Sequence, residues 1–208
     1  MTELEFSKHL NQYSDTIDAI RSRAHEIHDN VNQLYGGTHP YGYHLDMVAD
    51  AVMKYCASIC PTPDDIIPMV FGAYFHDSIE DARLTYNDVV AEAAHFMPHA
   101  LSITAAEIAY ALTNEKGRTR DQRANEKYYA GIRSTPYAPS VKLADRYANL
   151  SYSLMNDTDA NRHMSRIYLN EMPHFLQNIT TGSADPRLTL SPALLDKILS
   201  ATAPFNAK

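Results

Sequence analysis

Cysteine, basic residues and long hydrophobic runs are all scarce in this sequence. Cys56 and Cys60 are the only cysteines among 208 residues, and two thiols make neither a disulfide framework nor a cysteine-built zinc site. We expect both to be reduced core residues. The 18 Lys and Arg are outnumbered by 25 Asp and Glu, for a net charge of -7. Because nucleic-acid backbones are held by clustered Lys and Arg, we expect no DNA or RNA duplex as a partner.

No stretch approaches the roughly 18 apolar residues that a helix needs to span a bilayer. The first residues, MTELEFSKHLNQYSD, also lack the apolar segment of a secretory signal. We therefore expect a cytoplasmic protein with no membrane partner. With 45% hydrophobic and 21% charged residues, the composition is that of a soluble globular protein, and the length suffices for one sizeable core.

Apolar residues recur at helical spacing almost throughout, and the alternating Val, Ile and Thr runs typical of strands are absent. The pattern predicts an all-α protein, a compact helical bundle without internal repeats. We expect a domain over residues 1–180 and a C-terminal extension, 181–208, whose short helix packs on that domain. Thr85 and Thr104 are predicted N-caps. The predicted helices are 3–30, 46–60, 64–81, 86–96, 104–112, 119–132, 138–156, 159–179 and 192–202.

Two doublets of ionisable residues, His76-Asp77 and Glu80-Asp81, lie in the segment VFGAYFHDSIED. At about 3.6 residues per turn, a helix would place His76 over Glu80 and Asp77 over Asp81 on one face. Such groups are costly to bury unless they are paired or bound to a cation. A divalent metal would explain them together, with the first doublet as ligands and the second available for proton transfer. The alternative is a solvated helix end with ordinary charges.

A helix bundle can bring distant polar side chains into one interior site. His44 follows Pro40-Tyr41 at the start of the second helix, and Asp145 stands in the mostly apolar context VKLADR. Both are candidate partners for the His76-Asp77 doublet. Each also has a structural interpretation, His44 as a helix cap and Asp145 as a surface charge beside Arg146.

The ordered motifs PYGYH, FHDSIED and VKLADRYANL resemble the HD-domain metal-dependent phosphohydrolases. Within them the chain is most similar to the alarmone (ppGpp) hydrolases of the Rel/SpoT family and their small single-domain relatives, over about residues 24–153. The resemblance implies an HD-type bundle, with Glu80 and Asp81 as the catalytic acidic pair and nucleotide recognition near Asn149. It also implies a manganese ion with four ligands: His44, His76, Asp77 and Asp145.

The residue types agree with this chemistry. Two imidazoles and two carboxylates suit a transition-metal ion such as Mn²⁺ better than magnesium, although another divalent transition metal is also compatible. With such an ion to polarise water and phosphoryl oxygens, Glu80 or Asp81 can orient the water or protonate the leaving oxygen. We predict hydrolysis of a nucleotide phosphate or pyrophosphate linkage, and the resemblance implies conversion of ppGpp to GDP and pyrophosphate. Two alternatives stay open: hydrolysis of another nucleotide, and a non-catalytic nucleotide-binding sensor.

The family usually carries an H-x-x-Q-x-R-K stretch before its PY motif, whereas residues 28–34 here contain neither Arg nor Lys. The accepted base is therefore open, and Tyr35 or Tyr152 can supply aromatic stacking instead. A basic run over residues 116–127 can bind phosphates, or form a solvated helix face. A homo-oligomer is also left open. The residues expected to contact a small nucleotide substrate are Asn149, Lys142, Tyr152, Arg118 and Arg120.

Overall fold

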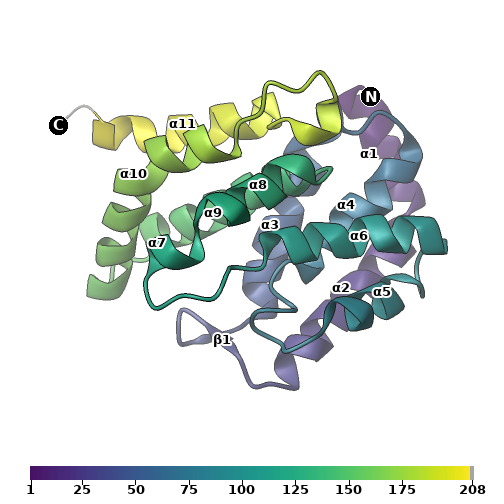
Figure 1. Ribbon diagram of the computed structural model, residues 1–208, viewed down its shortest axis with the longest axis horizontal. Helices are drawn as coiled ribbons and strands as arrows, with labels where there is room; N and C mark the ends of the chain where they lie inside the picture. Colours follow the sequence, from purple (N-terminus) through teal and green to yellow (C-terminus); the bar gives the residue numbers. More distant parts are fainter. Residues whose placement is uncertain (207–208) are drawn as a thin grey trace.

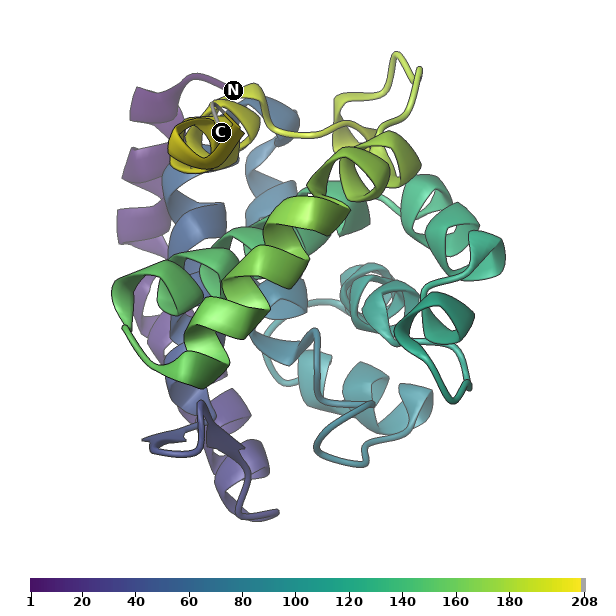
Figure 2. The ribbon, with the colours of Figure 1, turned by 90° about the vertical axis from the view of Figure 1, so that its left-hand side faces the viewer.

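Helices form nearly all of the regular structure in residues 1–206, which are the residues that the computed structural model describes (Figures 1 and 2). The all-α prediction is confirmed, since 71% of the chain is helical and 2% is strand. The α-helices are α1 (Glu3–Gln12), α2 (Ser14–Asp29), α3 (Gly42–Tyr55), α4 (Ile66–Phe75), α5 (Tyr86–Ala93), α6 (His99–Leu112), α7 (Arg120–Arg123), α8 (Glu126–Ser134), α9 (Ala138–Met155), α10 (Asp159–Ile179) and α11 (Pro192–Asn206). Short 3-10 helices are η1 (Ala57–Ile59), η2 (Pro63–Asp65) and η3 (Pro186–Leu188).

A small hairpin interrupts the helices between α2 and α3. Its strands, β1 (Leu34–Tyr35) and β2 (His39–Pro40), are antiparallel, with Tyr35 opposite His39. Figure 2 shows the hairpin at one end of the bundle, beside the C-terminal end of α2. The sequence predicted only a loop here, because a two-residue strand is too short to show alternation.

The long helices α9 and α10 match the predictions 138–156 and 159–179 to within one residue. The single helix predicted over 3–30 is wrong, because Tyr13 ends α1 with φ -97° and ψ 9°. The apolar spacing continues across this one-residue break, so periodicity could not detect it. The helix predicted over 119–132 is likewise divided, since Asn125 caps α8 by accepting a hydrogen bond from the Tyr128 N–H.

Of the two predicted N-caps, one is confirmed and one is wrong. Thr85 accepts the Asp88 N–H while Asp88 bonds back to Thr85, which forms a capping box at the start of α5. Thr104 instead lies inside α6, which begins after Pro98. Its hydroxyl donates to the Ala100 carbonyl at 3.4 Å, a local bond that a helix interior also permits.

The helix that carries the doublets ends earlier than predicted. Helix α4 stops at Phe75, His76 is its C-cap, and the following residues form turns. Both the hydroxyl and the N–H of Ser78 donate to the Phe75 carbonyl, which tightens the chain into a shorter turn. The prediction of one continuous helical stripe is therefore wrong, although the Asp81 N–H still bonds to the Asp77 carbonyl at 2.8 Å.

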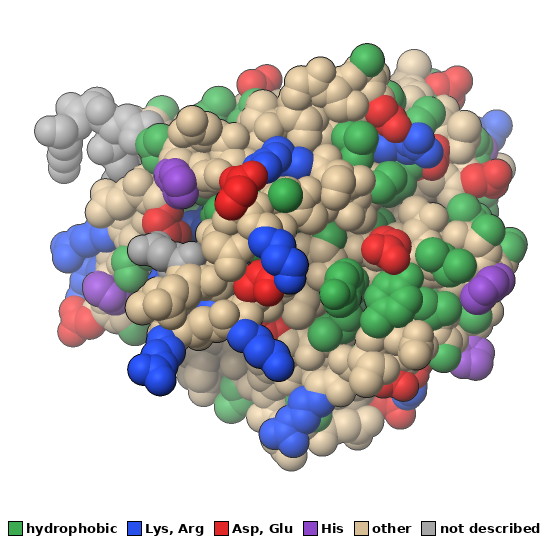
Figure 3. Space-filling view, viewed as in Figure 1, with side chains coloured by type: hydrophobic (Ala, Val, Ile, Leu, Met, Phe, Trp, Pro, Cys, Tyr) green, Lys and Arg blue, Asp and Glu red, His purple; other side chains and the backbone are tan. Residues whose placement is uncertain are grey.

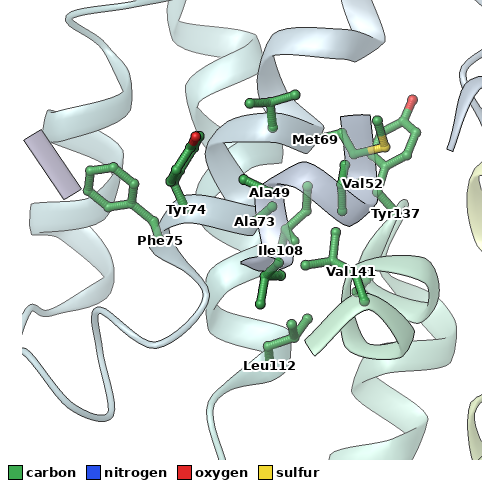
Figure 4. Packing of buried hydrophobic residues seen from close by; sticks show 14 of the residues in the cluster. Ala49, Val52, Met69, Ala73, Tyr74, Phe75, Ile108, Leu112, Tyr137 and Val141 are labelled. Atoms are coloured by element: carbon green, nitrogen blue, oxygen red, sulfur yellow. The ribbon is translucent and has the colours of Figure 1, made fainter. Parts of the chain in front are cut away.

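Helix α4 forms the centre of the core, because every one of its residues is buried. It packs against α2, α3, α6 and α9, and α3 also packs against α9. Figure 4 shows side chains from four helices meeting there: Ala49 and Val52 of α3, Ala73 of α4, Ile108 of α6 and Val141 of α9. This packing brings together the three helices that carry the candidate metal ligands.

Helix α11 packs on α9 and α3 and runs along one side of the bundle in Figure 1. Its Leu194 and Ile198 are fully buried, and the Ser191 hydroxyl before it donates to the Tyr55 carbonyl. The division at residue 180 into a domain and an extension stays a prediction. None of the helices in residues 1–206 combines the length and apolar character that crossing a bilayer requires.

A matched pair of glycines tests the packing of α4. A Cβ on Gly72 would lie 2.6 Å from Cγ2 of Ile108, whereas one on Gly131 of α8 would meet nothing within 4 Å. Both changes to Ala raise helix propensity, so Gly131→Ala should stabilise the protein by about 0.5–1 kcal/mol. Gly72→Ala should destabilise it by about 1–3 kcal/mol, because the added methyl overpacks the core. Urea unfolding measures both, and a stabilised Gly72→Ala protein would contradict the packing.

Candidate metal centre

Three packed helices supply the candidate ligands. His44 lies in the first turn of α3, His76 caps the C-terminus of α4 and Asp145 lies in the middle of α9. All three are buried, and one ligand atom from each lies within 4.8 Å of the other two. Asp77 follows His76 directly. Its side chain is 20% exposed, so it lies at the edge of this group.

The donor atoms have the spacing of a metal coordination shell. The Nε2 atoms of His44 and His76 are 3.2 Å apart. Oδ2 of Asp77 lies 3.0 Å from His76 Nε2 and 3.6 Å from His44 Nε2. Oδ1 of Asp145 lies 3.4 Å and 3.9 Å from the Nε2 atoms of His44 and His76, respectively. Adjacent ligands at metal distances of about 2.0–2.2 Å are roughly 2.8–3.6 Å apart, so the last of these five separations is slightly long and the other four fit. The group whose ligand atoms all lie within 4.8 Å of one another is His44, His76 and Asp145, and Asp77 lies beside it, close to the two imidazoles.

Hydrogen bonding directs the His76 ring toward this group. Its Nδ1 lies 2.8 Å from the Ala73 carbonyl, which can only accept, so Nδ1 carries the proton. In the neutral ring Nε2 then presents its lone pair to His44. Two facing lone pairs repel unless a proton or a metal ion lies between them. The two rings therefore fit either a proton or a metal ion between them.

The pKa of each group in the centre depends on the charges of its neighbours. Burial opposes a charge on His76, but Asp77 and Asp145 outweigh burial and raise the pKa of His76 to about 9. Burial would raise the pKa of Asp77, but the neighbouring imidazoles hold it below its ordinary value. Burial also opposes ionisation of Asp145, yet Lys142 and the imidazoles keep its pKa well below the usual range. The two carboxylates therefore stay ionised and require a neighbouring positive charge.

Two residues that were predicted to contact substrate hold Asp145. Lys142 Nζ donates to Oδ2 of Asp145 at 2.8 Å, and Asn149 Nδ2 donates to Oδ1 at 2.5 Å. Because all three lie on α9 at helical spacing, they share one face of the helix. The contacts orient the Asp145 carboxylate toward the two imidazoles.

The two carboxylates of the second doublet, Glu80 and Asp81, have different hydrogen-bond partners. The Tyr41 hydroxyl lies 2.6 Å from Oδ2 of Asp77 and 2.9 Å from Oδ2 of Asp81, so it links the two acids. Burial and the nearby Asp77 raise the pKa of Asp81. Glu80 is exposed and accepts hydrogen bonds from the backbone and side-chain amides of Asn114. Of the pair, Asp81 is therefore the one linked to a candidate ligand.

A cavity of about 440 Å³ opens beside the centre, among α7, α8, α9 and α10. Asp145, Lys142 and Asn149 line it, together with Arg120, Arg123 and Arg146 among others. Figure 3 shows several Lys and Arg side chains on the face that carries α7 and its flanking segments. The cavity lining thus includes three of the predicted substrate contacts, Asn149, Lys142 and Arg120. Arg118 and Tyr152 are not among the described lining residues, and their predicted contacts stay untested.

The sequence analysis did not identify one wall of the cavity. Glu171 of α10 accepts hydrogen bonds from both Arg120 and Arg146. The Arg146 guanidinium lies 4.9 Å and 4.4 Å from the ring centres of Tyr168 and Phe175. Tyr168, Glu171 and Phe175 are spaced along α10 so that they share one face, but nothing in that spacing predicts a cavity wall. Tyr41 stands in the PYGYH motif, yet its link to the two acids required the fold.

Comparisons with protein-family models, with curated proteins and with solved structures found no match for this chain. The likeness to the HD-domain hydrolases therefore rests on three motifs of the sequence. In the structure one residue of each motif contributes to the buried group: His44, His76 and Asp145.

We expect Mn²⁺ binding to weaken as the pH falls. In the metal-free protein His76, with a pKa of about 9, carries a second proton, on Nε2, below that pH. A metal ligand must be deprotonated, so binding displaces this proton and the apparent Kd rises about tenfold per pH unit below about 9. Isothermal titration calorimetry over about pH 6–8, in buffers of different ionisation enthalpy, measures both the Kd and the proton release. A Kd that does not change over this range would contradict the coupling.

Proposed function

We propose that this chain is a metal-dependent hydrolase that cleaves a phosphate or pyrophosphate linkage in a small nucleotide. The observation that carries the proposal is the meeting of two imidazole nitrogens and two carboxylate oxygens beside a cavity whose lining includes three arginines. A structural cluster needs no adjoining cavity, whereas a hydrolytic site does.

The proposed ligands are the two histidines and the two aspartates: His44, His76, Asp77 and Asp145. This donor set suits a divalent transition metal, and Mn²⁺ is our first candidate. When bound, such an ion supplies positive charge toward phosphoryl oxygens and acidifies water. The support is the pair of facing Nε2 atoms, which requires a cation or a proton.

Asp81 and Glu80 have separate roles in the proposal. Asp81 lies beside Asp77 through the shared Tyr41 hydroxyl, so it orients the attacking water and accepts its proton. Its raised pKa brings it closer to the working range of a general base. Glu80 accepts hydrogen bonds from Asn114, which lines the cavity, so its proposed role is to hold Asn114 at that wall, and the proton that Asp81 accepts from water passes to the leaving oxygen.

The cavity suits a nucleotide in size and in chemistry. Its volume of about 440 Å³ lies in the usual range for small-molecule sites. Arg120, Arg123 and Arg146 line the cavity, and arginine binds phosphate oxygens in a bidentate manner. Arg120 and Arg146 also pair with Glu171, so a phosphate group would share them with that carboxylate. Aromatic side chains, Tyr129 among them, line the cavity as well. With the family resemblance, these features make ppGpp the first substrate to test, with GDP and pyrophosphate as products.

The base is the least constrained part of this substrate. Gln33, in the stretch that lacks Arg and Lys, lies 3.1 Å from His28, and neither residue is in the described lining of the cavity. This stretch therefore supplies no cation to a base in the cavity. A panel of nucleotides with different bases has to accompany ppGpp in any assay.

The proposed activity predicts pyrophosphate release. Purified, Mn²⁺-loaded protein is incubated with ppGpp, GTP, ATP and the adenosine analogue of ppGpp, and the products are resolved by ion-exchange chromatography. We expect ppGpp to yield GDP and pyrophosphate. Asp77→Ala should lower the rate by at least about 100-fold, because it removes a ligand and the partner of His76. Asp185→Asn is the matched control, since Asp185 pairs with Arg187 outside the centre and the cavity.

The outcomes separate the alternatives. Pyrophosphate release only from a nucleotide that lacks guanine would support the hydrolase proposal and reject ppGpp as its substrate. Tight binding of a nucleotide without release would favour a sensor. If Asp77→Ala hydrolysed ppGpp at the wild-type rate, the proposed centre would be excluded.

A further inference from the structure

We infer that Tyr35 is a positioning residue for the metal centre, and that it orients two ligands, His44 and Asp145, at once. The inference rests on the proposed metal-dependent function and deepens it. Tyr35 ends β1 and lies outside the three motifs that indicated the centre. Its ring contacts one ligand, and its hydroxyl reaches the other through an amide.

The first contact is a stacked pair. The rings of Tyr35 and His44 have centres 4.8 Å apart and planes inclined by 19°. Metal-binding histidines usually donate their second ring N–H to an oxygen, which fixes the ring. Nδ1 of His44 is buried and has no hydrogen-bond partner among the described residues. Packing must therefore orient this imidazole, with Tyr35 on its face and Tyr41 edge-on at 5.6 Å.

The second contact passes through Asn149. The Tyr35 hydroxyl donates to Oδ1 of Asn149 at 2.9 Å, and Nδ2 of Asn149 donates to Oδ1 of Asp145. That oxygen is the one 3.4 Å from His44 Nε2. Because a carboxylate only accepts, Asn149 must present its NH₂ group to Asp145 and its oxygen to Tyr35. The hydroxyl therefore fixes the side-chain amide in the orientation that Asp145 requires.

The hairpin holds Tyr35 against α9. Gly36 has φ +59°, and a Cβ there would lie 2.1 Å from the hydroxyl of Tyr152, so the turn packs closely on that helix. The Tyr152 ring lies 4.7 Å from the Tyr35 ring. Tyr35 is thus partly buried against α9, and it is not among the described residues that line the cavity. These contacts favour a positioning role over stacking on the substrate base.

Two substitutions separate the contacts. Tyr35→Phe keeps the ring on His44 and removes the hydroxyl, whereas Tyr35→Leu removes both. Tyr86→Phe is the matched control, because the Tyr86 hydroxyl donates to Glu107, which is outside the centre. The Kd for Mn²⁺ is measured on metal-free protein by electron paramagnetic resonance of the free ion. Urea unfolding without metal reports the stability of each variant.

We expect Tyr35→Phe to raise the Kd for Mn²⁺ about tenfold and Tyr35→Leu about 100-fold, as for other partners of metal ligands. Tyr86→Phe should leave the Kd unchanged even where it lowers the stability. With saturating Mn²⁺, the KM of Tyr35→Phe for the nucleotide should equal that of the wild type. An unchanged Kd in Tyr35→Phe would overturn the inference. If Tyr35→Leu does not fold, Tyr35→Phe alone is the deciding variant.

The test distinguishes this inference from the proposed function. Wild-type protein that binds no Mn²⁺ would overturn both. Wild-type protein that binds Mn²⁺ with the expected dependence on Tyr35, yet hydrolyses no nucleotide, would support the positioning role and reject the hydrolase.

Discussion

The facing ring nitrogens of His44 and His76 impose the main constraint on this structure. They are 3.2 Å apart in the interior, and the His76 ring is held by the Ala73 carbonyl so that its Nε2 faces His44. A proton or a metal ion between the two nitrogens satisfies such a pair. Asp77 and Asp145 lie against the same nitrogens, and buried carboxylates favour a positive charge at this position. The preference for a cation thus comes from the two carboxylates together with the facing rings, without reference to any relative.

The fold meets this constraint with an unusually apolar central helix. Because α4 is buried on all sides, α3 and α9 can both pack against it and bring His44 and Asp145 toward its C-terminal end. The early end of α4 then turns Asp77 and Asp81 toward the Tyr41 hydroxyl. Asp145 also lines the cavity, to which α7 contributes arginines and α10 contributes aromatic rings. Core packing and the candidate site are therefore parts of one arrangement.

Sequence reasoning was most successful where the information is local. The helical spacing of α9 and α10, the cap at Thr85, and the cost of burying His76 and Asp145 can all be read from short segments. It failed where hydrogen bonds that the spacing does not show set the end of an element, as at the end of α4, where the Ser78 hydroxyl donates to the Phe75 carbonyl. The link from Tyr35 to Asn149 spans 114 residues, and no periodic pattern could have indicated it.

The central claim is that His44, His76, Asp77 and Asp145 bind one divalent ion. Crystals of the protein grown with Mn²⁺ allow the most direct test, an anomalous difference map from data collected at the manganese absorption edge. The account predicts one strong peak within coordination distance of both Nε2 atoms and of a carboxylate oxygen from each aspartate. A map without a peak at this position, or with its peak elsewhere on the protein, would contradict it.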